Sequence, residues 1–165
     1  MISPYVQDYA LTLNRFLEHA AKWHPKAGLV TATGGGGSTR ITYEELLVRS
    51  QQFSAGLSEM GVRLGDRVAT LAWNTQAHVE AWYGISGIGA VVHTLNPRLA
   101  VETLAAMVRQ AECRVLIVSA SLADMAVSLA KLAPSIAQII VIDETIDVAA
   151  LQSPVTASLH ADILR

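Results

Sequence analysis

The sequence predicts an α/β fold with a doubly wound, mainly parallel sheet of the flavodoxin-like kind. A short apolar run at residues 68–72 has the length and bounds of a buried strand. Four apolar residues then recur at helical spacing: Ala77, Ala81, Ile85 and Ile88. A second apolar run at residues 90–92 completes a strand–helix–strand crossover. Such a crossover joins parallel strands in a sheet that is covered on both faces.

Particular residues mark the boundaries of this crossover. Asn74 follows the first strand and is a residue type that caps helix N-termini by accepting a backbone N–H bond. Pro97 terminates the unit. Four small residues near the end of the helix are expected to let it lie close against the sheet: Gly84, Ser86, Gly87 and Gly89.

Upstream of the crossover, the sequence predicts a loose arm, a helix, a short hairpin and a second helix. The arm covers residues 1–11. One face of the first helix carries Leu13, Phe16, Leu17 and Ala20, and Pro25 lies beyond its end. Residues 29–32 and 40–42 are expected to form the hairpin.

The second helix begins at a capping box formed by Thr42 and Glu45. Its apolar stripe then runs through Leu46, Ser50, Phe53, Leu57 and Met60. Gly61 suits a helix C-terminus in the left-handed conformation, and Gly65-Asp66 turns the chain into the first core strand.

Downstream, the alternation of helices and strands continues. A helix stripe at residues 104–111 is preceded by Ala100, which cannot cap. Residues 115–118 and 139–142 are expected to be strands, separated by a helix that Ser121 caps and Pro134 ends. Residues 144–165 are less regular, with one short helix expected near residues 148–152. The strand order cannot be inferred from the sequence.

Composition excludes several classes of function. The 165 residues are 52% hydrophobic and 16% charged, with a formal net charge of −2 and scattered basic residues, so nucleic-acid binding is not expected. Residues 81–95 lean apolar but are broken by glycines, and a membrane-spanning helix needs ~20 apolar residues, so no transmembrane segment is expected. The mean hydropathy of +0.36 instead favours a surface that meets further parts of a larger protein.

The first residues and the cysteine content favour a cytoplasmic protein. Residues 1–5 lack the basic and apolar regions of a secretory leader. Cys113 is the only cysteine, which excludes an internal disulfide and fits a reducing compartment. We expect Cys113 to be a buried, inert thiol ahead of a strand, and a reactive thiol is the alternative.

The glycines at residues 34–37 could cradle an anion, because glycine exposes backbone N–H groups. Walker-type loops, however, need a lysine and a hydroxyl just after the glycines, and Ser38-Thr39-Arg40 follows here. A flexible hairpin turn is therefore the favoured interpretation.

Two histidines are candidates for a site. His78 and His93 lie on different expected elements, and no carboxylate or thiol shows metal-ligand spacing with them, so no metal site is expected. His93 ends a strand at the carboxyl edge, where doubly wound sheets bind ligands. His93 and Asn96 are therefore candidate cleft-lining residues, and a structural role is the alternative for His93.

Five motifs follow one another along the chain: Ile41–Leu46, Gly61–Ala69, Trp73-Asn74, Gly89-Ala90-Val91 and His93–Leu99. Together, in this order and at these intervals, they resemble the adenylate-forming acyl-CoA synthetases of the luciferase-like superfamily. His93-Thr94 ahead of Leu95-Asn96-Pro97 resembles the branch that activates medium- and long-chain fatty acids. The resemblance covers about Leu13 to Asp143.

The resemblance implies a fatty-acid–CoA ligase that uses ATP, Mg²⁺ and CoA and forms an acyl-adenylate. The family's phosphate loop ends in Pro-Lys-Gly, and no Pro-Lys-Gly occurs in this sequence. We therefore expect the N-terminal part of such an enzyme, or a truncated relative, that is inactive alone and binds none of these cofactors tightly. No catalytic, cofactor-binding or metal-ligating residue carries over to this chain. Asn74, Gly89 and Pro97 carry over as structural motif residues only.

The resemblance also implies how the chain is divided into parts. Residues 12–143 would be an α/β subdomain of the synthetase large domain, and residues 144–165 an irregular tail.

The roles of the aromatic residues and of the N-terminal arm each leave an alternative open. Trp73, Trp82 and Tyr83 are expected to pack in the core, although they could line an acyl-chain pocket. Some relatives dimerise through this region, so Asp8 is a possible contact in a homo-oligomer. A non-catalytic dimerising interaction module is the alternative function.

Overall fold

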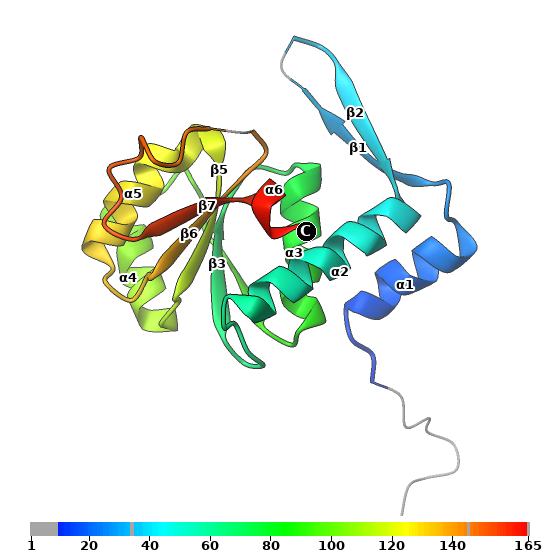
Figure 1. Ribbon diagram of the computed structural model, residues 1–165, viewed down its shortest axis with the longest axis horizontal. Coiled ribbons are helices and arrows are strands. Elements are labelled where there is room, and N and C mark those ends of the chain that lie inside the picture. Colours follow the sequence, from blue (N-terminus) through cyan, green and yellow to red (C-terminus); the bar gives the residue numbers. More distant parts are fainter. Residues whose placement is uncertain (1–9, 34, 145, 165) are drawn as a thin grey trace, which may run out of the picture.

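The computed structural model describes residues 10–33, 35–144 and 146–164. The described residues form an antiparallel hairpin that projects from the body and a five-stranded sheet flanked by helices (Figure 1). The elements in chain order are α1 (Asn14–Trp23), β1 (Gly28–Ala32), β2 (Ser38–Thr42), α2 (Tyr43–Glu59), β3 (Arg67–Leu71), α3 (Gln76–Gly87), β4 (Val91–Thr94), α4 (Val101–Ala111), β5 (Val115–Ser119), the 3₁₀ turn η1 (Ala120–Leu122), α5 (Ala123–Leu132), β6 (Gln138–Ile142), β7 (Thr156–Leu159) and α6 (His160–Ile163).

The larger sheet has the order β4-β3-β5-β6-β7, and all neighbouring strands in it are parallel. Its first strand in the chain, β3, lies between the second and the third, which is the flavodoxin-like doubly wound order. The predicted fold class is therefore confirmed, together with the N-terminal hairpin of β1 and β2. The crevice at which such sheets bind ligands lies outside the carboxyl ends of β3 and β5.

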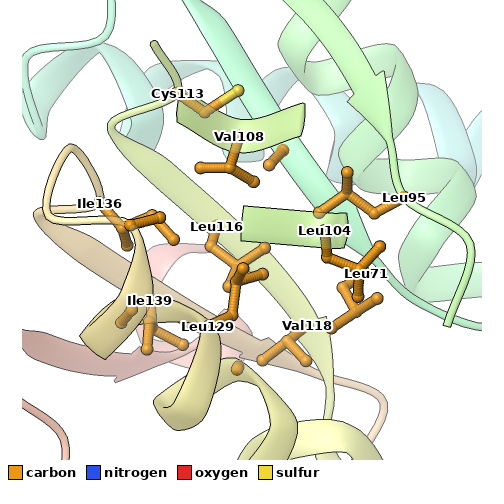
Figure 2. Close-up of a cluster of buried hydrophobic side chains, with 14 of the residues drawn as sticks. Leu71, Leu95, Leu104, Val108, Cys113, Leu116, Val118, Leu129, Ile136 and Ile139 are labelled. Carbon is orange, nitrogen blue, oxygen red and sulfur yellow. The ribbon is translucent and has the colours of Figure 1, made fainter. Parts of the chain in front are cut away.

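Helices cover both faces of the sheet, with α4 and α5 on one face and α2 and α3 on the other (Figure 1). In β5, Leu116 and Val118 belong to the cluster under α4 and α5 (Figure 2), whereas Val115 and Ile117 belong to the cluster under α2 and α3. Successive side chains of a strand point to opposite faces. A strand that is buried on both faces is therefore apolar without interruption.

Both ends of α2 form as predicted. The hydroxyl of Thr42 accepts a hydrogen bond from the N–H of Glu45 at 3.2 Å, and the Glu45 carboxylate accepts one from the N–H of Thr42 at 2.9 Å. These bonds to Thr42 stabilise the ionised carboxylate and lower the pKa of Glu45. At the other end Gly61 adopts a φ of 87°, and its N–H donates to the carbonyl of Ser58.

The apolar face predicted for α1 is only partly buried. Leu17 packs with Ile41 and Leu46, but Leu13 and Phe16 are 46% and 68% exposed. The predicted apolar face of this helix is therefore buried at Leu17 and largely exposed at Leu13 and Phe16. Asp8 and most of the predicted arm lie outside the described residues, as does Gly34.

Two predicted helix caps are wrong. Thr75, not Asn74, caps α3, because the turn after β3 is one residue longer than the expected one and leaves Asn74 exposed. Ser121 lies inside the 3₁₀ turn that precedes α5, and its hydroxyl bonds to the indole of Trp73 instead of capping. The N-cap position of α5 is Leu122, which makes no side-chain cap bond.

The expectation of an irregular segment after residue 143 is partly wrong. Residues 148–150 form a turn, not the expected short helix. Residues 156–159 form β7, which pairs in parallel with β6 and extends the sheet by one strand. The strand was missed because it is four residues long and mixes polar with apolar residues, so it carries little periodicity.

The small residues of α3 serve a helix–helix contact. A Cβ atom on Gly84 would lie 2.8 Å from a ring carbon of Phe53, and one on Gly87 would lie 2.6 Å from the hydroxyl of Ser54. Both neighbours belong to α2, so these glycines let α2 approach α3. The expectation that they bring α3 close to the sheet is therefore corrected.

Candidate functional site

Polar side chains gather where the parallel strands end. Thr75 follows β3, Ser119 ends β5, Asp143 follows β6 and His160 follows β7. Because the strands are parallel, their carboxyl ends lie along one edge of the sheet. This edge is where open α/β sheets of this kind bind ligands.

Trp73 bridges the crevice between β3 and β5. Its backbone N–H donates to the hydroxyl of Ser119 at 3.0 Å, and its indole N–H donates to the hydroxyl of Ser121 at 3.0 Å. The Trp73 side chain nevertheless remains 44% exposed, and that of Trp82 remains 36% exposed. The expectation that both tryptophans belong to the core is therefore wrong. Trp82 lines a hollow of about 420 Å³ between the hairpin and α3.

Thr75 ties the start of α3 to the end of β6. Its Oγ1 accepts a bond from the N–H of His78 at 3.3 Å and is also hydrogen-bonded to the carboxylate of Asp143. Asp143 has a φ of 78°, which residues other than glycine rarely adopt. The capped helix and the strained residue thus support each other across the edge of the sheet.

His78 is held between two groups at the end of β3. Its Nδ1 lies 3.0 Å from the carbonyl of Trp73, and its Nε2 lies 3.0 Å from the hydroxyl of Thr70. Burial lowers the pKa of His78, so the ring is neutral at pH 7. A carbonyl can only accept, so Nδ1 carries the proton and Nε2 accepts from Thr70.

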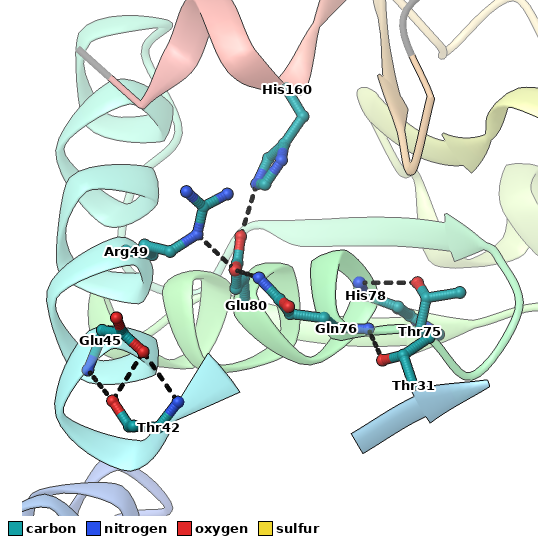
Figure 3. A network of polar contacts seen from close by, with 9 residues as sticks. All are labelled: Thr31, Thr42, Glu45, Arg49, Thr75, Gln76, His78, Glu80 and His160. Atoms are coloured by element: carbon teal, nitrogen blue, oxygen red, sulfur yellow. Dashed lines mark hydrogen bonds and ion pairs between the residues drawn. The ribbon is translucent and has the colours of Figure 1, made fainter. Parts of the chain in front are cut away.

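Glu80 is a fully buried carboxylate on α3 (Figure 3). Its Oε1 accepts from Nε of Arg49 at 2.5 Å and from the amide of Gln76 at 2.8 Å. The Arg49 side chain, from α2, is 39% exposed, so the pair joins the interior to the surface. This arrangement is what a buried charge requires, namely a partner and further hydrogen bonds.

His160 faces the other oxygen of Glu80. Its Nε2 lies 3.4 Å from Oε2, which is within ion-pair distance, but neither atom has a hydrogen-bond partner. The ring also meets Phe53 edge-on, with centroids 4.9 Å apart. Burial is the strongest influence and lowers the pKa of His160, whereas the charge of Glu80 acts in the opposite direction. His160 is therefore neutral at pH 7.

The partners of Glu80, namely Arg49, Gln76 and His160, border a hollow of about 690 Å³ between the hairpin, α2, α3 and α6, although Glu80 itself does not line it. Arg49, Gln76 and His160 supply donors to its wall, and Asp143 and Glu144 supply carboxylates. Its volume is within the range of roughly 300–1,000 Å³ that ligand sites occupy. We take this hollow as the candidate functional site of the described residues.

The two residues predicted to line a cleft are not brought together here. His93 lies in β4 and is half-buried, with its Nε2 buried and without a hydrogen-bond partner. Asn96 is exposed, and its side chain accepts from the N–H of Arg98 at 3.0 Å. Neither residue lines the 690 Å³ hollow. Their role in a cleft stays a prediction.

Arg49 and His160, which line the hollow, and Glu80, which they both contact, were not predicted as site residues. Glu80 lies three residues after Ala77 and one before Ala81, inside the apolar stripe of α3. A single carboxylate within an apolar helical stripe is the signal that could have found it, because such a charge needs a partner. Nothing local to Arg49 or His160 identifies them as those partners.

Three further observations concern the described residues as a whole. No group of three or more His, Cys, Asp or Glu side chains that could hold a metal ion occurs in the part of the chain that the structure describes. Within the same residues, no helix has the length and apolar character needed to cross a membrane. Cys113 is fully buried, and its burial raises the pKa of the thiol to about 11.

A flavodoxin-order sheet with a polar carboxyl edge defines an open α/β domain of a ligand-binding class. Comparison with known proteins narrows that class. The family model for the AMP-binding enzyme matches residues 16–161, and the chain belongs to this family. The predicted family is therefore confirmed.

Similar proteins include CoA ligases. A medium-chain-fatty-acid–CoA ligase of Ectopseudomonas oleovorans is 36% identical over 107 residues, which is 65% of this chain and 20% of the relative. A long-chain-fatty-acid–CoA ligase of Thermus thermophilus is 35% identical over 139 residues, or 84% of this chain and 26% of the relative. The chain thus spans about a fifth to a quarter of these curated relatives.

A solved structure confirms the fold. The crystal structure of coronafacic acid ligase from Pectobacterium brasiliense superposes with a TM-score of 0.80 at 18% identity. The match covers 93% of this chain and 29% of that structure. At this identity the likeness concerns the fold alone.

Proposed function

We propose that this chain is the N-terminal part of a fatty-acid–CoA ligase. The whole enzyme would join a fatty acid to CoA in two steps, with an acyl-adenylate as intermediate and AMP and diphosphate as products. The observation that carries this proposal is the pair of relatives at 35–36% identity, both of which are fatty-acid–CoA ligases. Membership of the AMP-binding enzyme family supports the adenylate step.

In this proposal the chain supplies scaffold and one wall of the assembly. ATP, Mg²⁺ and CoA serve the whole enzyme, which we place in the cytoplasm. The carboxyl edge, with its 690 Å³ hollow, is the part of the chain that would face bound substrates or the remainder of the enzyme. We propose that residues 1–165 alone form no acyl-CoA, because the family's Pro-Lys-Gly phosphate loop does not occur among them.

A dimerising interaction module is the second candidate. The side chains of Phe16 and Trp23 on α1 are 68% and 62% exposed, and exposed apolar side chains of this size are typical of interaction surfaces. A homodimer through α1 would cover them. Light scattering tests this candidate: a monomeric mass at high concentration contradicts it.

An assay of two samples tests the ligase proposal. The purified chain is incubated with ATP, Mg²⁺, CoA and octanoate, and octanoyl-CoA is measured by chromatography. We expect no octanoyl-CoA from residues 1–165. We expect the protein encoded by the complete reading frame to release AMP only when octanoate is present. Octanoyl-CoA formed by the chain alone would contradict its inactivity. A complete reading frame that ends at Arg165 would favour the interaction module.

A further inference from the structure

A second hollow, of about 710 Å³, lies at the opposite, amino-terminal edge of the sheet. It is lined by the first residues of three adjacent strands: Arg67 of β3, Val115 of β5 and Gln138 of β6. The turn after α2, residues 60–63, and Ser135 complete its wall. None of its lining residues borders the hollow at the carboxyl edge. Its volume also suits a small ligand.

Donors without partners line this hollow. The guanidinium groups of Arg63 and Arg114 make no hydrogen bond or ion pair with any described residue. The hydroxyl of Ser135 is buried and also has no hydrogen-bond partner. Because this oxygen has almost no solvent-accessible surface, the unpaired donors that a ligand in the hollow meets are those of the two exposed guanidinium groups.

The carboxylates beside these donors are already engaged. Asp66 accepts from the backbone N–H of Arg63 at 2.8 Å, and Glu112 pairs with Arg67 at 2.9 Å. The Nε of Arg67 donates to the carbonyl of Ala111 at 2.7 Å, which fixes this side chain in the wall. Three arginines face two carboxylates, so the hollow is positive although the chain carries a net charge of −2.

We propose that this hollow binds a small anion of the diphosphate class, held by Arg63 and Arg114. Guanidinium groups match phosphate oxygens with paired hydrogen bonds, and two of them suit a ligand with two charged groups. The concave wall favours a compact anion over an acidic peptide. This proposal concerns the isolated chain and does not rest on the ligase activity.

Titration of the chain with sodium diphosphate tests the proposal. We expect one saturable site by calorimetry, with NMR shifts confined to the amides of residues 61–67, 112–115 and 135–138. Arg63→Gln and Arg114→Gln should each weaken binding about tenfold, because each removes a charge-assisted contact. Arg98→Gln is the matched control, since Arg98 is exposed and follows the carboxyl end of β4, and it should bind as the wild type does.

Ser135→Ala is a second control, because Ser135 lies in the wall of the hollow but its hydroxyl has almost no accessible surface. Because the hydroxyl is buried without a partner, its removal should leave thermal stability unchanged or raised and the affinity for diphosphate unchanged. Absence of saturable heat at millimolar diphosphate would overturn the proposal. Equal affinity in the Arg63 and Arg114 variants, equal weakening by Arg98→Gln, or saturable binding of an acidic peptide but not of diphosphate would do so too.

Discussion

The guanidinium of Arg49 on α2 donates to the carboxylate of Glu80 on α3 across 2.5 Å, and the Glu80 side chain is completely buried. The same two helices meet where Gly84 lies against Phe53. A carboxylate without hydration is stable only when a cation and further donors replace water. The pair therefore fixes how α2 and α3 pack, beside the hollow at the carboxyl edge.

Removal of Arg49 is expected to destabilise the fold. Arg49→Met leaves the Glu80 charge buried, and loss of one partner of a buried pair costs roughly 3–5 kcal/mol. Because Arg49 is partly exposed, we expect a fall of about 3 kcal/mol in the free energy of unfolding, measured with urea. The double variant Arg49→Met/Glu80→Gln should recover more than half of this loss. If the losses of unfolding free energy in the single variants Arg49→Met and Glu80→Gln simply add in the double variant, the buried-pair interpretation is contradicted.

Stability is expected to depend on pH through His160. Burial lowers its pKa in the folded state, so below the unfolded value of about 6.5 the unfolded chain binds the proton more readily. Stability is therefore fully present above about pH 6.5 and falls as the pH decreases towards the folded pKa. His160→Gln should flatten the pH dependence of the unfolding free energy in this window.

The control for this pH experiment is His24→Gln, because His24 is exposed. Its unfolding free energy should follow the wild-type pH dependence. His78 has a pKa lowered by burial as well and remains in both variants, so the pH dependence should be reduced by His160→Gln and not abolished. An unchanged slope in His160→Gln would show that His160 does not contribute.

The sheet and the ends of α2 were predictable because their signals are local. β5 is a continuous apolar run that is buried on both faces, and a run of this kind can be recognised without its neighbours. Thr42 and Glu45 lie three residues apart, so the capping box is visible in the sequence. The family motifs likewise occupy fixed intervals along the chain.

The candidate site was not predictable because its contacts are long-range. His160 meets Glu80 only after β7 joins the edge of the sheet, and β7 has too short a pattern to identify. Asn74 and Thr75 are both good capping types, so the sequence does not decide between them. The length of the turn after β3 decides, and the bond of Thr75 to Asp143, a residue from a distant strand, supports the choice.

Substitution of Thr75 should therefore matter more than substitution of Asn74. Thr75→Ala removes the cap of α3 and the bond to Asp143, which together should cost about 1–3 kcal/mol of unfolding free energy. Asn74→Ala changes an exposed residue and should stay within about 0.5 kcal/mol of the wild type. Urea unfolding of both variants measures the difference. A larger loss of unfolding free energy in Asn74→Ala than in Thr75→Ala would indicate that Asn74 is the cap.

Cys113 is expected to resist modification in the folded chain. Its side chain is fully buried, and a pKa of about 11 leaves on the order of one thiol in a thousand ionised at pH 8. Because the thiolate is the reactive form, labelling with a chromogenic disulfide should proceed only as fast as the structure opens. The same thiol in urea is the matched control and should react at least about a hundredfold faster. Equally fast labelling of the folded chain would mean that Cys113 is an accessible, reactive thiol.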